Sequence, residues 1–524
     1  MAAQNGTGAD AALAEAVACR APERVAEILM HNMWHFYNGD FAAAQAAIAS
    51  LPGPLLDRFP VLRLAHPIGV VEARTDRPFA SADFDDLLAA SDPAAAGLLI
   101  MAQVTATRVS GDVAGALSAA RRLRAWIQQN DFAAMSRDDG PLWLFHHQIA
   151  STFLLAGDTV EALRQFGIAR QIGIASGSQN AARSATGRIA IVQAIRGALT
   201  EAELALHEAA AQPAPSGAYA SSSYGSERAA AALISVERLA DDVDERIAGL
   251  ATFDNSETVW PLEVLAKARL AIARHEPAEA IEQSSIAAAT HPIQAGAFSA
   301  DVIDSTTITA LLALGDLAAA DRAIQSARSR GPMTRLAAVE AAIHHGDYMQ
   351  AREDLRYIST RAALPLIQRA EVDMLTARVE ALKTGQIPSR LAEQIADAVA
   401  RRGYRRLATT LPAPLIPLIR GHLAPASAHD FDSATAGLRF ASSGNGLSRA
   451  LTDGERRVLD ALTAHETVAD IARALHVSPN TIKTQLRSLY RKMGVSSRAD
   501  AIAASGRVKP TDAAARAPGR LGDW

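Results

Sequence analysis

The chain has 524 residues, of which 49% are hydrophobic and only 5% aromatic, and its formal net charge is -4 at pH 7. A chain of this length is too long to fold around a single compact core, so we expect at least two folding units. Cys19 is the single cysteine, which excludes a disulfide framework and a cysteine-based metal cluster and fits a reducing cytoplasm. The chain shows no signal-peptide pattern and no apolar run near the roughly 18 residues of a membrane span.

Alanine dominates the apolar residues. It is the best helix former and is poor in strands, so the composition predicts an all-α protein. Residues 1–20 are expected to be a flexible lead-in to the first helical region.

A short pattern, here called the hairpin mark, recurs between residues 21 and 423. It consists of a Gly-Asp pair with an alanine four residues after the aspartate. Complete copies begin at Gly39, Gly111, Gly157, Gly315 and Gly346, and degenerate copies stand at Gly197 and His275. The steps between successive marks are 72, 46, 40, 78, 40 and 31 residues, and most of them are near one or two repeat lengths of about 40.

Each residue of the mark has a physical role in a helical hairpin. Glycine ends one helix, aspartate caps the next, and alanine lets the two helices approach closely. The pattern resembles a degenerate tetratricopeptide-like helical-repeat array, and this resemblance implies a sensor or partner-docking region. The alternative is an irregular all-α domain without true repeats.

Three segments interrupt the helical pattern. Residues 212–226 are rich in Pro, Ser and Gly and are expected to form a loop that splits the array into two halves. Residues 424–448 have the composition of a flexible linker. Residues 507–524 are expected to be a disordered tail.

Residues 449–506 contain four short predicted helices. Residues 455–462 form the first, and Thr467 caps the second at residues 468–475. After a short turn, Ser478 caps the third helix and Pro479 occupies its first position; Gly494 ends it. The fourth runs from Ser496 or Ser497 to about Ala504.

The third helix has two contrasting faces. Ile482, Leu486, Leu489 and Met493 form one apolar stripe, flanked by Tyr490. The opposite face carries Asn480, Thr484, Arg487 and Arg491, with Lys483 beside them. Residues 471–499 include six basic residues (473, 483, 487, 491, 492 and 498) and no acidic one. A helix-turn-helix with such an outward face suits the major groove of DNA, whereas the alternative is a three-helix bundle used for protein contacts.

This stretch resembles the LuxR-type helix-turn-helix domain of bacterial transcription regulators. The matching residues are Leu451-Thr452, Glu455, Val458-Leu459, Asp470-Ile471-Ala472, Leu475, Val477-Ser478, Thr481-Ile482-Lys483, Lys492-Met493, Val495 and Arg498. The resemblance implies that Lys483, Thr484 and Arg487 read bases, that Thr481 and the start of the third helix, with Asn480, meet phosphates, and that the fourth helix pairs two domains. The positions of Arg491 and Lys492 further along the third helix place them towards the DNA backbone. Ala499, Ile502 and Ala503 give the fourth helix an apolar side for the pairing. The sequence departs from the family at Gly454, His465 and Gln485, where Arg, Gly and His are usual.

Patterns for catalysis are missing from the sequence. There is no phosphate-binding G-x-x-x-x-G-K-[ST], no complete H-E-x-x-H, no G-x-S-x-G and no dinucleotide fingerprint. We therefore expect no enzyme, cofactor or metal site, but a cytoplasmic bacterial transcription regulator. We expect the protein to bind double-stranded DNA as a homodimer and to bind an effector or a protein partner on the array. The alternative is an interaction scaffold whose terminal domain has lost DNA binding.

Overall fold

The structure is a computed structural model in which two parts of the chain are described. They are residues 2–441, except 39–40, 60, 63–83, 86–87, 89–92, 131–141, 177–178, 216–218, 251–258 and 361–363, and residues 453–490, except 466, 476, 479–481, 484 and 487–488, together with 498, 501 and 502. The elements of the described residues are all helices, with one isolated bridge between Pro412 and Ala441 and no strand. The protein is therefore all-α, as predicted.

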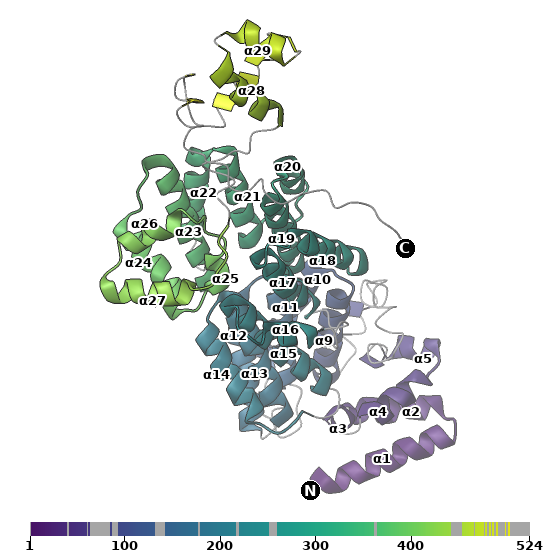
Figure 1. Ribbon diagram of the computed structural model, residues 1–524. Helices are drawn as coiled ribbons and strands as arrows, with labels where there is room; N and C mark the ends of the chain where they lie inside the picture. The colour runs from purple at the N-terminus through teal and green to yellow at the C-terminus, as the bar shows by residue number, and fades with distance from the viewer. Residues whose placement is uncertain are drawn as a thin grey trace, which may run out of the picture. The chain divides into compact units, whose positions relative to one another are not determined.

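The chain divides into two compact units. The first, called the array, comprises Met1–Leu411 and Leu415–Arg439; the second, called the C-terminal unit, comprises Pro412–Pro414 and Phe440–Trp524. The array begins with α1 (Ala2–Ala18), α2 (Pro22–His31), α3 (Met33–Asn38), α4 (Phe41–Ala49) and α5 (Gly53–Arg58) (Figure 1). These helices share an apolar core of their own, built from residues between Ala9 and Leu62.

A series of helical hairpins makes up most of the array (Figure 1). The pairs are α9 (Pro93–Val109) with α10 (Val113–Gln129), α11 (Leu142–Leu155) with α12 (Thr159–Ala175), α13 (Gln179–Arg196) with α14 (Leu199–Ala210), α15 (Tyr219–Arg238) with α16 (Val243–Ala248), α17 (Trp260–Ala273) with α18 (Pro277–Thr290), α19 (Phe298–Leu314) with α20 (Leu317–Gln325), and α21 (Pro332–His345) with α22 (Tyr348–Thr360). The array then ends with α23 (Leu366–Thr384), α24 (Ser389–Ala396), the π-helix η3 (Asp397–Arg401), α25 (Arg405–Ala408), α26 (Leu415–Gly421) and α27 (Pro425–Thr435).

The hairpin marks lie where one helix of a pair gives way to the next. Asp112, Asp158 and Asp316 each accept a hydrogen bond from the backbone N–H three residues on, at 2.8, 3.0 and 2.9 Å. The alanines of the marks (44, 116, 162, 202, 280, 320 and 351) are at most 2% exposed. The cap is as predicted at these three marks, and the burial of the alanines agrees with the predicted close approach of the helices. Gly39 and Asp40 lie outside the described residues. The resemblance of the array to tetratricopeptide repeats remains a prediction.

The expected flexible lead-in is wrong for most of residues 1–20, because α1 occupies residues 2–18. Ala9, Leu13 and Ala16 are buried on one face of this helix, in the core shared with α2. The spacing of four and three residues is that of a helix stripe. The alanine-rich composition of this segment did not reveal that its helix packs against α2.

The expected loop at 212–226 is shorter than predicted, because α15 begins at Tyr219. Ser223 and Ser226 are fully buried. A Cβ placed on Gly187 of α13 would lie 3.7 Å from the Cβ of Ser226. Small residues here serve close helix packing, which a sequence pattern does not distinguish from a loop composition.

The expected linker at 424–448 also begins with a helix. Pro425 occupies the first position of α27, after Ala424 in an extended conformation. Phe431 is fully buried in the main core of the array. Residues 424–439 therefore belong to the array, and residues 442–448 of the expected linker lie outside the described part of the chain.

A buried ion network joins early and late helices of the array. The carboxylate of Glu237 in α15 accepts from Arg269 Nη1 and from Arg406 Nε, each at 2.8 Å. Glu237 is fully buried, and Arg406 in α25 lies 169 residues away in sequence. Because buried charges require partners, this network stabilises one arrangement of these helices.

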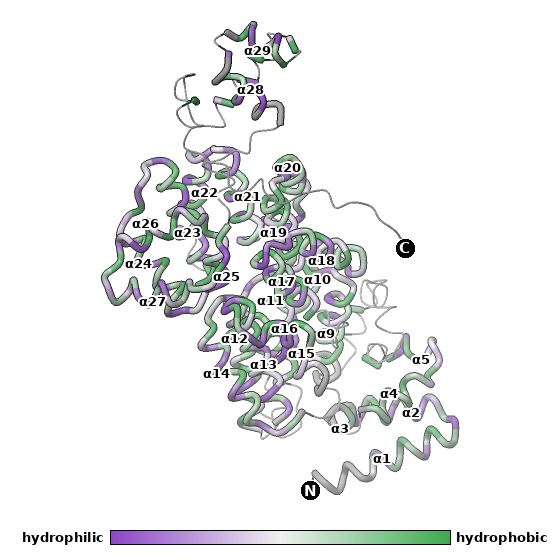
Figure 2. Tube along the Cα trace, viewed as in Figure 1, coloured by the Kyte–Doolittle hydropathy of each residue, from purple (hydrophilic) through white to green (hydrophobic). Residues whose placement is uncertain are grey.

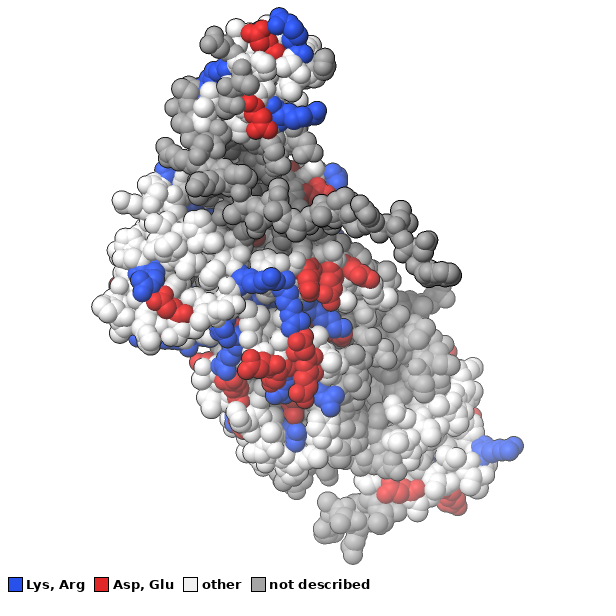
Figure 3. Space-filling view, in the orientation of Figure 1, with Lys and Arg blue, Asp and Glu red and all other residues white. Residues whose placement is uncertain are grey.

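Hydrophobic and hydrophilic residues are intermingled along the helices of the array (Figure 2). Among the described helices, none is both long and apolar enough to cross a membrane. The face drawn in Figure 3 carries Lys and Arg beside Asp and Glu over the array. Ion pairs of the array include Arg238–Glu203 and Arg274–Asp244.

Candidate nucleic-acid interface

The C-terminal unit contains α28 (Asp453–Ala464) and α29 (Val468–Ala474). Thr467 caps α29 as predicted: its Oγ1 accepts from the backbone N–H of Asp470 at 3.2 Å and donates to Asp470 Oδ2 at 2.6 Å. The bond from Thr467, followed by the bond from Arg473, holds the pKa of Asp470 below its usual range. A negative charge in the first turn of a helix also suits the helix dipole.

A tight turn leads from α29 into the third helix. The N–H of Val477 donates to the carbonyl of Ala472 at 3.0 Å and closes the end of α29. The N–H of Ile482 donates to the carbonyl of Ser478 at 3.2 Å, which is the first helical bond after a cap at Ser478. The predicted helix-turn-helix connection is therefore present in the described backbone.

The apolar stripe of the third helix faces the core of the unit, as predicted. Ile482 and Leu489 are fully buried and Leu486 is 8% exposed, while Tyr490 packs partly against the same core. That core also holds residues of the first two helices and Ala501. Met493, the last member of the stripe, lies outside the described residues.

Lys483 is the predicted base-reading residue that the structure describes, and its side chain is exposed beside buried Ile482. The other predicted DNA-contacting residues lie outside the described part: Thr484, Arg487, Asn480, Thr481, Arg491 and Lys492. Of the predicted dimerisation residues, Ala499 and Ala503 are likewise outside. Ile502 is half-buried and packs against the core of its own unit.

Arg498 has a structural role that the sequence analysis did not assign. Its Nη2 donates to the carbonyl oxygen of Leu462 at 2.8 Å and also to that of His465. It thereby satisfies carbonyls at the end of α28 that have no partner within the helix. No local pattern links residues this far apart; the only signal was the match of Arg498 to the family. His465, where the family usually has Gly, supplies only its backbone to this contact.

The comparisons with known proteins concern this same unit. Residues 449–505 match the family model "Bacterial regulatory proteins, luxR family". The C-terminal unit holds a LuxR-type domain. Its curated relatives include the "Probable transcriptional regulatory protein NarL" of two strains of Mycobacterium tuberculosis, each 40% identical over 66 residues. That alignment covers 13% of this chain and 31% of each relative, so the chain spans about a third of the length of these relatives.

The array contains histidines and acidic residues that could in principle bind a metal ion. Within the described residues, no group of three or more His, Cys, Asp or Glu side chains could hold a metal ion. His146 and His147 in α11 are packing residues: His146 Nδ1 lies 2.6 Å from Gln165 Oε1, and His147 makes edge contacts with Trp143 and Phe166. Burial lowers the pKa of both histidines.

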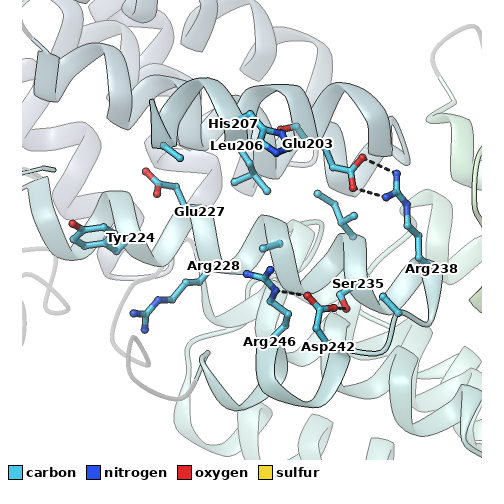
Figure 4. Close-up of a pocket in the computed structure, with 14 residues that line it drawn as sticks. Glu203, Leu206, His207, Tyr224, Glu227, Arg228, Ser235, Arg238, Asp242 and Arg246 are labelled. Atoms are coloured by element: carbon cyan, nitrogen blue, oxygen red, sulfur yellow. Dashed lines mark hydrogen bonds and ion pairs between the residues drawn. The ribbon is translucent and has the colours of Figure 1, made fainter. Parts of the chain in front are cut away.

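A cavity of about 480 Å³ lies between α14, α15 and α16 (Figure 4). Its apolar lining includes Leu206, Ala231 and Ile234. The carboxylates that line it are engaged with protein groups: Glu203 with Arg238, Asp242 with Ser235 and Arg246, and Glu227 with Arg183. This cavity, called the α14–α16 cavity, therefore presents satisfied carboxylates to a ligand.

Proposed function

We propose that the protein is a bacterial transcription regulator that binds specific DNA sequences through its LuxR-type domain. The observation that carries the proposal is the family match of residues 449–505 together with the two-faced third helix. In that helix Ile482 and Leu486 face the core while Lys483 points outward. A helix held in this way can enter a major groove with its polar side.

Within this proposal, Lys483, Thr484 and Arg487 read bases, and Asn480, Thr481, Arg491 and Lys492 contact phosphates or flank the site. Two domains pair through Ala499, Ile502 and Ala503 and so read two half-sites in inverted order. The contact of Ile502 with its own core leaves only part of that side chain for a partner. We further propose that the protein acts in the cytoplasm and that an effector or partner bound to the array controls DNA binding.

The test is retention of DNA by the full-length protein. Sheared bacterial genomic DNA is passed over immobilised protein, the retained fragments are sequenced, and affinity for the enriched site is measured against salt. We expect a log–log slope of about -0.9 for each phosphate contact released from counterions. A chain lacking residues 440–524 is the control and should retain nothing. If neither chain retains DNA, the scaffold alternative is favoured. Equal retention by the two chains would contradict binding through the LuxR-type domain.

A further inference from the structure

A second cavity, of about 410 Å³, lies where the first large hairpin meets later helices of the array. The turn between α9 and α10 packs against the loop that precedes α19: a Cβ on Gly111 would lie only 2.7 Å from Pro292. Gln294 Nε2 donates to Asp112 Oδ1, and Gln294 Oε1 accepts from the N–H of Ala114, both at 3.1 Å. These contacts join segments about 180 residues apart, and the hollow beside them is called the seam cavity.

Polar side chains from buried positions line the seam cavity. Glu263 in α17 and Ser299 in α19 are each only 7% exposed. Glu263 Oε1 pairs with Lys267 Nζ. Within the part of the chain that the structure describes, Glu263 Oε2 and the Ser299 hydroxyl make no hydrogen bond to protein groups. Neither atom is fully enclosed by protein, so both are open to the cavity and can hydrogen-bond a polar ligand there.

Three charged side chains line the seam cavity: Arg108, Glu263 and Lys267. The guanidinium of Arg108 donates to Gln148 and Thr152, so Glu263 and Lys267 define the class of ligand. Glu263 and Lys267 are one helical turn apart on α17, and Lys267 has hydrogen-bond donors beyond the one used by Glu263. A ligand with one ammonium and one carboxylate group can pair with both residues at once and enter without adding net charge, which limits the desolvation penalty. Trp260, Val264 and Ile286 add an apolar wall for the rest of the ligand.

We propose that the seam cavity binds a small α-amino acid with an apolar side chain. Its ammonium group donates to Glu263 Oε2 and to Ser299, and its carboxylate accepts from Lys267. The volume is within the range of about 300–1,000 Å³ that is usual for small-molecule sites. Because the cavity touches both the α9–α10 turn and α17–α19, the bound amino acid strengthens the seam. The role of this amino acid as the effector that controls DNA binding rests on the proposed function, whereas its binding to the cavity does not.

The α14–α16 cavity supplies a matched control. It too holds a carboxylate paired with a cation, Glu203 with Arg238, but both oxygens of Glu203 are engaged by the arginine. Glu263→Gln should therefore weaken amino-acid binding while Glu203→Gln should not.

The experiment is calorimetry of the full-length protein with L-leucine, L-phenylalanine and L-tryptophan. For the one that binds best, the matching acid without the amine and the matching amide without the carboxylate are titrated too. We expect each truncated analogue, and each of the variants Glu263→Gln and Lys267→Met, to raise Kd by about tenfold or more, as the loss of a charge-assisted hydrogen bond does. Glu203→Gln should leave Kd within about twofold.

Several outcomes overturn the proposal. One is that none of the three amino acids binds at about 10 mM, a concentration that detects millimolar affinity. Another is that an analogue with one charge binds as well as the zwitterion. If Glu263→Gln or Lys267→Met does not fold by circular dichroism, Ile286→Trp replaces it. Ile286 is 52% exposed at the cavity, so its enlargement should block binding without unfolding the chain; retained binding there overturns the proposal. DNA retention is measured separately, so failure of the seam site and failure of the regulator proposal are distinguishable.

Discussion

The array and the C-terminal unit are both built from short helices, but they treat polar groups differently. The array buries charges, such as Glu237 between Arg269 and Arg406. In the C-terminal unit, the described buried residues are all apolar, and the polar side chains described there lie outside the core. Polar pairing thus specifies contacts between distant helices in the array. In the smaller unit, the core is apolar and Lys483 of the third helix is exposed to solvent.

Removal of a buried charge should give the largest effect and should be confined to the array. Glu237→Gln removes the carboxylate that is hydrogen-bonded to the buried Arg269 and Arg406, which should lower the free energy of unfolding by about 3–5 kcal/mol. Urea unfolding of the full-length protein, followed by far-UV circular dichroism, measures the change.

The matched control for that experiment is Glu203→Gln. The side chains of Glu203 and its partner Arg238 are 34% and 35% exposed, so loss of this pair should lower stability by no more than about 1 kcal/mol. Equal losses in the two variants would show that burial does not distinguish the two ion pairs.

A substitution that creates a cavity in the core of the LuxR-type domain should destabilise only the C-terminal unit. Ile482 is fully buried there, and Ile482→Ala should lower the stability of that unit by about 2–5 kcal/mol. Thermal unfolding of residues 440–524 checks this value. The neighbouring Lys483 is exposed, and Lys483→Ala should stay within about 0.5 kcal/mol. A similar loss in both variants would contradict the assigned faces of the third helix.

The outer face of the same helix should separate specificity from affinity. On the sequence-based assignment Arg487 can reach the two acceptors of a guanine edge, so Arg487→Ala should weaken binding to the selected site by about 1–3 kcal/mol and relax the preference at one base pair. Lys492→Ala should weaken binding equally on every sequence and lower the salt slope by about one. Both variants are titrated with selected and scrambled duplexes. Equal losses for Arg487→Ala on the two duplexes would make its assignment as a base reader wrong.

The separation in sequence between interacting residues explains which features could be predicted from the sequence. The hairpin marks, the Thr467 cap and the apolar stripe at Ile482 depend on residues within one or two turns of each other, and each of these was predicted. The pairing of Glu237 with Arg406 spans 169 residues and leaves no local signal.

Segments of small residues were misjudged for a related reason. The burial of Ser223 and Phe431 depends on partners that a local window does not contain. Composition alone therefore favoured a loop at 212–226 and a linker at 424–448 where packing produces the start of α15 and the whole of α27. The carbonyl contacts of Arg498 were missed likewise, because they connect residues 33 and 36 positions apart.

The smallest expected effect concerns a degenerate hairpin mark. His275 adopts φ = 63°, whereas glycines at five other marks adopt φ between 78° and 87°. A left-handed conformation costs an L-residue about 1–2 kcal/mol, and glycine returns part of that gain through its greater freedom in the unfolded chain. His275→Gly should therefore raise the stability of the array by about 0.5–1 kcal/mol, measured as a higher urea midpoint at an unchanged slope.

The reverse substitution sharpens the test. Gly315 has φ = +78°, and a Cβ built on it would meet nothing within 4 Å. Gly315→Ala therefore introduces backbone strain without a clash, and we expect it to lower stability by about 1 kcal/mol. Opposite signs for the two variants would show that the degenerate mark keeps the turn geometry of the complete ones at an energetic cost. If His275→Gly lowers stability, the histidine side chain contributes more to this turn than glycine's backbone freedom would, and the mark at residue 275 is maintained by a different interaction.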